Sequence, residues 1–213
     1  QEKLLDSSFR LADIVRAQAG AENRVIPGVL IEKEPLNSEM PKSLINVRAL
    51  VIDDALEPEE LDEEALATES GFRRFLELQE EFKANLRKIA ELGVNLVLVD
   101  RGVHNLAEEF LTDQQVMVVQ RVPNKELRRA AEHLGAKTIK RTGLKKGKTE
   151  LQKYLGEAQE VYYDEKLKHV RILGGSGKAQ ATVLVGASTE EVVGERERIA
   201  KDAASAVQAA VRG

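Results

Sequence analysis

The sequence predicts an α/β fold, in which short buried strands alternate with amphipathic helices. The apolar, β-branched run 47–52 is short enough to be a buried strand. Over 71–93, apolar side chains recur at steps of three and four, as on one face of a helix. From residue 95 onward, strand-like and helix-like segments alternate. The 213 residues allow one large domain or two small ones.

The first part of the chain combines an arm, strands and an acidic block. Residues 1–20 carry scattered apolar side chains, and we expect an arm outside the core, with at most a short helix. The run 25–31 predicts a strand that a Pro-Gly pair interrupts, and the strand 47–52 follows. Asp and Glu crowd 53–64, which indicates a solvated helical or irregular excursion.

The helix that starts at Gly71 is expected to end at Gly93, because glycine suits the position after a helix. Phe72 and Phe75 lie beside the acidic block and are expected to be more exposed than Phe82, which fits a core position. The elements expected next are strands at 95–99, 115–122 and 137–140 and helices at 105–111 and 125–134, the second capped by Asn124.

The last part of the chain predicts two strands joined by a turn, then a strand and a long helix. The stretch Gly174–Lys178 lacks the first Gly and the hydroxyl of a phosphate-binding loop, so we expect a mobile hairpin turn. Ser188 and Glu191 have the spacing of a capping box. The expected elements are strands at 160–163, 168–173 and 181–185 and a helix to Val211 with Val192, Ile199, Ala203 and Val207 on one face.

The composition excludes several classes of protein. Lys and Arg total 32 against 36 Asp and Glu, and this net charge of -4 argues against a generally basic nucleic-acid-binding protein. The absence of Cys removes disulfides and thiolate chemistry, and the three His have no ligand spacing. No apolar run reaches the roughly 18 residues of a membrane helix. We expect a soluble, cytoplasmic protein without a metal site, and the start at Gln1 suggests a fragment or a processed chain.

One stretch, 121–148, is strongly basic, and only Glu126 and Glu132 oppose its Lys and Arg. It could bind nucleic acid, could be a solvated surface, or could meet the acidic block of a neighbouring copy. A nucleic-acid-binding α/β domain is therefore an alternative function. No nucleophile elbow or patterned carboxylate pair indicates an enzyme site.

The order of several segments resembles the apical domain of group II, thermosome-type chaperonins. The entry into that domain is similar to Gly28–Glu34, Met40–Lys42 and Ala49–Ile52. Two departures, Pro27 before Gly28 and Gly186–Ser188 before Thr189, indicate a divergent branch, which we expect to be bacterial. The other matching segments are Ile89–Val99, Arg101–Val103 with Leu106–Ala107 and Leu111, Val116–Val122, Leu127 to Lys137, and Ala181 to Ala203.

The resemblance implies a β-sandwich flanked by helices, with a helical protrusion and flanking intermediate-domain segments. By position, the apical domain is 28–185 and the protrusion, a built-in lid, is 57–82. Residues 1–27 and 186–213 correspond to the intermediate domain.

The resemblance also implies function: the substrate-binding and lid-forming part of an ATP-dependent protein-folding machine. The implied partners are unfolded or partly folded proteins and like subunits in a double ring, with neither a membrane nor nucleic acid expected. Phe72 and Phe75 are the implied lid residues. The implied substrate-binding residues, on the second of two cavity-facing helices, are Lys125, Arg128, Arg129 and Glu132.

Asp202 matches a family carboxylate that helps activate the water attacking ATP. The nucleotide-binding motifs of the family are missing from this sequence, so ATP and magnesium would bind elsewhere in the parent protein. We expect no cofactor in this chain, and neither binding nor hydrolysis of ATP by the chain alone. Measurable ATPase activity of the isolated chain would contradict this expectation.

Overall fold

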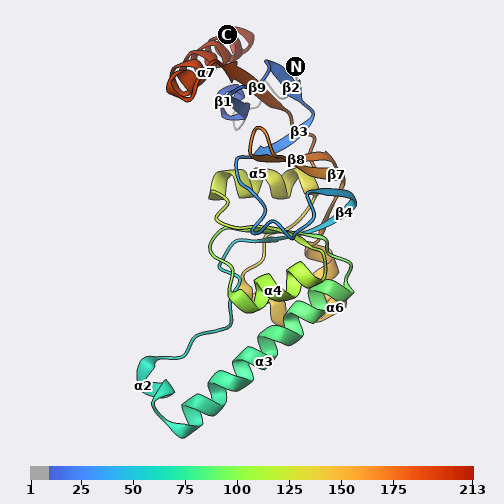
Figure 1. The fold of residues 1–213 in the computed structure, drawn as a ribbon. Helices are drawn as coiled ribbons and strands as arrows, with labels where there is room; N and C mark the ends of the chain where they lie inside the picture. The colour runs from blue at the N-terminus through green and yellow to red at the C-terminus, as the bar shows by residue number, and fades with distance from the viewer. Residues whose placement is uncertain (1–9) are drawn as a thin grey trace.

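The computed structural model describes residues 10–213, which form the elongated body shown in Figure 1. A six-stranded sheet lies at the centre. A three-stranded sheet and the C-terminal helix lie at one end, and a long helix projects from the other. Residues 1–9 of the expected arm lie outside the described residues.

The central sheet has the strand order β3-β8-β7-β4-β5-β6. β4 joins its two parts, because it pairs antiparallel with β7 and parallel with β5. The expected segment 137–140 forms only a bridge between Ile139 and Ile52. The strands are β3 (Gly28–Ile31), β4 (Ser43–Ile52), β5 (Leu96–Val99), β6 (Met117–Val119), β7 (Gly156–Asp164) and β8 (His169–Gly175).

Helices cover both faces of this sheet, which confirms the predicted α/β class with flanking helices. α5 (Asn124–Leu134) packs on one face through Leu127, Ala130 and Leu134. On the other face, α3 (Glu69–Glu91) and α4 (Asn105–Asp113) cover the alternate residues of β4 and β5. The short helices are α2 (Glu63–Leu66), η2 (Arg141–Lys145), α6 (Lys148–Leu151) and η3 (Gln152–Tyr154).

A crease crosses the middle of the sheet. Leu44 and Val47 pack against the same core, although residues three apart on a regular strand point to opposite faces. Between them, Asn46 has a φ of 51°, and the strand register places it opposite Gln159. Gly174, on the other side of Gln159, has a φ of 66°, and a Cβ there would lie 2.8 Å from Gln159 Cβ. The left-handed backbone at Asn46 and Gly174 therefore bends β4 and β8 at the same level of the sheet.

The three-stranded sheet has the order β1-β9-β2, and β1 pairs parallel with β9. The expectation of an arm over residues 1–20 is wrong from residue 11 onward, because Ile14, Val15 and Ala17 are buried. Pro27 divides the expected strand 25–31 between the two sheets. The elements are η1 (Leu11–Ile14), β1 (Val15–Ala19), β2 (Arg24–Ile26) and β9 (Thr182–Ala187).

α7 (Glu190–Arg212) packs on this sheet through a different face from the one predicted. Ile199 and Val207, which share the predicted apolar face, are 54% and 53% exposed. The packed face includes polar side chains that accept hydrogen bonds from backbone amides: Gln208 Oε1 accepts from the Leu11 amide at 2.8 Å. The predicted capping box is also wrong, since Thr189 is the N-cap and makes no side-chain cap bond.

Two further local predictions need correction around α5. Pro123, not Asn124, is its N-cap, and Asn124 Nδ2 instead donates to Asp53 Oδ1 at 2.9 Å. The Gly-rich stretch is not a mobile hairpin turn. β8 continues through Gly175, and the Gly177 amide then donates to the His133 carbonyl at 2.9 Å, closing the C-terminal end of α5.

Candidate functional site

The segment 57–82, expected to be the protrusion, contains α2 and the first part of α3, which stand away from the body in Figure 1. Thr68 begins α3, and its Oγ1 accepts a hydrogen bond from the Gly71 amide at 2.9 Å. A Cβ on Gly71 would lie 1.6 Å from the Ala65 carbonyl oxygen, so only glycine permits this close approach of α2. The sequence therefore defines a tight turn at the tip.

Apolar side chains are exposed at this tip. Phe72 is 56% exposed, and its ring stacks on that of Phe75 with 6.4 Å between the centroids. Leu76 and Leu66 are 47% and 37% exposed. Leu76 was not among the residues predicted from the sequence. Its place outside the apolar period of α3 is the signal that could have identified it. The tip can thus contact apolar groups of another molecule.

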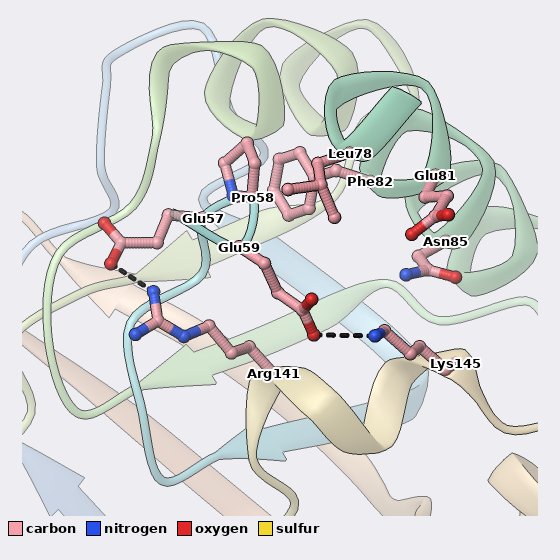
Figure 2. A pocket seen from close by; sticks show the side chains of 9 residues that line it. All are labelled: Glu57, Pro58, Glu59, Leu78, Glu81, Phe82, Asn85, Arg141 and Lys145. Atoms are coloured by element: carbon pink, nitrogen blue, oxygen red, sulfur yellow. Dashed lines mark hydrogen bonds and ion pairs between the residues drawn. The ribbon is translucent and has the colours of Figure 1, made fainter. Parts of the chain in front are cut away.

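The root of the protrusion is a packed joint, shown in Figure 2. Leu78 and Phe82 of α3 lie beside Pro58 of the incoming segment. Glu59 pairs with Lys145 of η2 at 2.7 Å, and Glu57 pairs with Arg141. The pocket between them measures about 20 Å³, room for about one water molecule, so it does not suit a ligand.

The acidic block and the basic stretch meet within one chain, which answers one question that the sequence left open. Besides the pairs at the root, Lys140 lies 3.3 Å from Asp53, and Lys148 pairs with Glu91. Lys88 of α3 also contacts this stretch, but through the backbone: its Nζ donates a hydrogen bond to the Leu144 carbonyl at 2.7 Å. Much of the basic charge proposed for nucleic acid is therefore neutralised inside the molecule.

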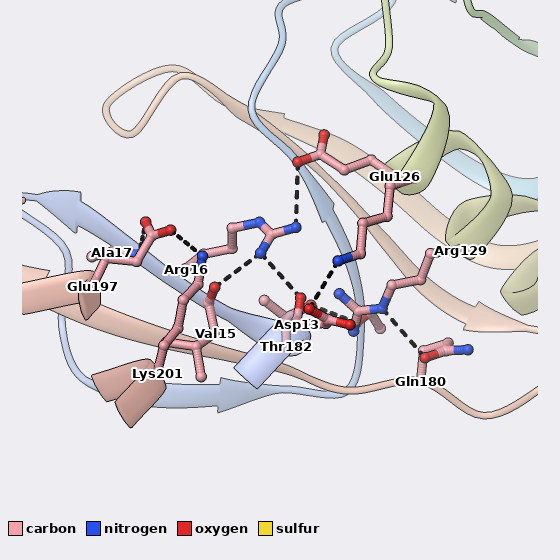
Figure 3. Close-up of polar contacts among 12 residues, drawn as sticks. Asp13, Val15, Arg16, Ala17, Glu126, Arg129, Gln180, Thr182, Glu197 and Lys201 are labelled. Atoms are coloured by element: carbon pink, nitrogen blue, oxygen red, sulfur yellow. Dashed lines mark hydrogen bonds and ion pairs between the residues drawn. The ribbon is translucent and has the colours of Figure 1, made fainter. Parts of the chain in front are cut away.

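The candidate substrate residues on α5 have different environments. Arg128 and Glu132 are exposed. Lys125 pairs with Asp13 at 2.8 Å, at the terminal sheet. Arg129 is half-buried and donates to the Ala181 carbonyl and to Gln180 Oε1, the second of which Figure 3 shows. Burial lowers the pKa of Arg129 to about 10, so its guanidinium remains charged at neutral pH.

Asp202 lies exposed on α7, at the end of the molecule opposite the protrusion (Figure 1). Over residues 10–213, no group of three His, Cys, Asp or Glu side chains could hold a metal ion. A single exposed carboxylate is insufficient to hold magnesium or a nucleotide. In the same part of the chain, no helix is long and apolar enough to cross a bilayer.

Comparisons with known sequences give consistent matches. The sequence profile of the TCP-1/cpn60 chaperonin family matches residues 3–213. The thermosome subunit of Pyrococcus horikoshii is 32% identical over 194 residues, which are 88% of this chain and 34% of that protein. Thermosome subunit beta of Archaeoglobus fulgidus is 32% identical over 208 residues, 93% of this chain and 37% of the relative. The chain thus spans about a third of the length of these relatives.

Solved structures match the whole fold. A crystal structure of a group III chaperonin in the open state is 52% identical, with a TM-score of 0.94, and covers 99% of this chain and 43% of its own. An open-state monomer of a group II chaperonin from Methanococcoides burtonii is 21% identical with a TM-score of 0.70, covering 95% and 46%. At that identity, the second match shows the fold alone.

Proposed function

Because the chain belongs to the TCP-1/cpn60 chaperonin family, we propose that it is the substrate-binding and lid-forming part of an ATP-dependent protein-folding chaperonin. The resemblance to thermosome-type chaperonins is confirmed. We assign residues 28 onward to the apical domain and 57–82 to the protrusion. β9 pairs with β1 and β2 of the terminal sheet. We therefore place the boundary at which the chain leaves the apical domain for the intermediate domain within 176–181 instead of after 185. Residues 1–27 and those after the boundary are then intermediate domain.

The exposed apolar tip carries this proposal. A monomeric soluble domain gains nothing from an outward stack of Phe72 on Phe75 with Leu76 beside it. Non-native polypeptides expose apolar side chains, and so would the tips of neighbouring subunits, so either contact would bury this surface. We propose the tip as the contact for lid closure and for substrate.

The exposed part of α5 offers a second, polar contact. Arg128 and Glu132 are free to meet substrate, since both side chains are exposed. Arg129 can contribute only by leaving the Ala181 carbonyl, whereas Lys125 is exposed although it pairs with Asp13. We therefore narrow the proposed polar contact to Lys125, Arg128 and Glu132.

ATP and magnesium belong to the parent protein in this proposal. No group of three His, Cys, Asp or Glu side chains among residues 10–213 could hold a metal ion, but Asp202 could face a nucleotide bound by another part of the polypeptide, where its carboxylate would orient the attacking water. The parent is proposed to work in the cytoplasm as a ring of like subunits. The basic stretch 121–148 gives no comparable support to a nucleic-acid-binding function, since carboxylates of the same chain pair with much of it.

The test is whether the chain suppresses aggregation of a chemically denatured protein, followed by light scattering. We expect suppression by the unmodified chain, and at least a roughly twofold loss for Phe72→Ser combined with Leu76→Ser, because both side chains offer exposed apolar area.

The matched control is Ile199→Ser with Val207→Ser, which removes equally exposed apolar area from α7 instead. Equal loss in both double variants would show non-specific stickiness and contradict the assignment to the tip. Salt-dependent binding of the chain to DNA or RNA, without any suppression of aggregation, would favour the nucleic-acid alternative instead.

A further inference from the structure

The central and terminal sheets meet at a junction with a small apolar core. The chain passes between the sheets at Pro27 and again at 176–181. Among residues 10–213, the buried residues of the apolar cluster at the junction are Ile26, Leu30 and Leu184, far fewer than in either cluster of the central sheet. Two units joined by a small apolar contact are expected to move relative to each other. Polar contacts must therefore fix the orientation of the central unit, which is the six-stranded sheet with its helices, on the terminal unit, which is the three-stranded sheet with α7.

Two ion pairs cross this junction from adjacent residues of α5. Arg16 of β1 lies 3.4 Å from Glu126, and the two side chains are only 14% and 18% exposed. Asp13 of η1 lies 2.8 Å from Lys125, in a more exposed position. The charges are opposite in sign at Asp13 and Arg16 and again at Lys125 and Glu126, so each carboxylate pairs with a cation. Figure 3 shows the pair of Arg16 with Glu126.

The same helix also holds the returning chain. The amides of Gly177 and Lys178 donate to the carbonyls of His133 and Glu132, at 2.9 and 2.8 Å. Arg129 then bonds the Ala181 carbonyl just before β9. Both sides of the junction are therefore fastened to α5.

The contacts continue from β1 to α7. Glu197 Oε2 accepts from the Ala17 amide at 3.3 Å, and Glu197 pairs with Lys201 at 2.5 Å. Arg16, next to Ala17, thus lies between α7 and Glu126 of α5. A movement of α7 would therefore pass through Glu197 to β1 and displace Arg16.

We propose that the pairs Arg16–Glu126 and Asp13–Lys125 form a latch that fixes the orientation of the central unit on the terminal unit. While the latch is closed, a displacement of α7 carries α5 and the central sheet with it. When it opens, the two units turn independently about Pro27 and 176–181. This inference goes beyond substrate binding and does not depend on it.

The experiment measures a distance between the two units by paired spin labels, and the absence of native Cys makes the labelling selective. Labels at Ser205→Cys on α7 and Thr138→Cys near β4 both occupy exposed positions. We expect one narrow distance distribution for this labelled chain. Adding Asp13→Ala and Glu126→Ala should broaden it about twofold or add a second population.

The control is Glu157→Ala, which removes the 3.9 Å pair with Arg48 inside the central unit and should leave the distribution unchanged. A second measurement uses salt. At 1 M salt, exposed charges are screened over about 3 Å, so the exposed Asp13–Lys125 pair should weaken and the distribution of the labelled chain should broaden, while that of the latch variant should change little. An unchanged narrow distribution in salt, or in a folded latch variant, would overturn the proposal.

Discussion

At the scale of single residues, His169 shows how burial selects a protonation state. Its side chain is fully buried, and Arg171 Nε donates to His169 Nε2 at 2.7 Å. Because that guanidinium can only donate, Nε2 is the acceptor, and Nδ1 carries the proton toward Gln18 Oε1 at 2.5 Å. Burial, with the charge of Arg171, lowers the pKa of His169 to about 4.

Stability should consequently depend on pH through this residue. The unfolded chain, with a His pKa of 6.5, binds the proton more readily than the folded chain, so folding weakens as pH falls from about 6.5 to about 4. The loss should reach between about 1 and 3 kcal/mol after solvent screening, measured by urea unfolding at pH 7 and pH 4.5. His169→Gln keeps a donor and an acceptor and should remove this loss. His104→Asn, which keeps the cap acceptor of α4, should retain it, and the reverse pattern would contradict the assignment.

At the scale of elements, the start of α3 controls the tip of the protrusion. Thr68→Ala removes the acceptor for the Gly71 amide and should cost about 1 kcal/mol locally. Hydrogen exchange should therefore quicken over 69–76, while the central strands keep their rates. Thr68→Ser retains a hydroxyl and is the control. Equal exchange in the alanine variant and the unmodified chain would mean that the cap does not hold the tip.

Elements could be predicted where their signal is local. The apolar period of α3 identified both the helix and its buried residues Phe82 and Leu86. β1 was missed because its apolar residues, Val15 and Ala17, are small and few, and its partner β9 lies far along the chain. α7 was found but given the wrong packed face, since an apolar stripe does not reveal which neighbour is present. The pairing across the junction, such as Arg16 with Glu126, is equally non-local.

The charged surfaces illustrate the same limit at the scale of the whole molecule. The sequence showed an acidic block and a basic stretch, and it left open whether the basic stretch binds nucleic acid, is solvated, or meets the acidic block of a neighbouring copy. Folding brings Glu59 to Lys145 and Asp53 to Lys140, so the balance is internal. The exposed candidates for recognition are then few, and the tip around Phe72 is the one that local pattern and structure both support.

The two sheets should differ in stability, because most of the apolar core belongs to the central one. Ala49 of β4 and Leu184 of β9 provide a matched comparison: each lies in a strand paired on both sides, and their side chains are 0% and 1% exposed. Native-state hydrogen exchange should give the Leu184 amide the lower opening free energy and the weaker urea dependence, as for a smaller unfolding unit. Leu184→Ala, which removes part of the small junction cluster, should quicken exchange throughout β1, β2 and β9 but not in β4. Identical opening free energies and urea dependences at the two amides would instead mean that the sheets unfold together, with the polar junction as strong as the cores.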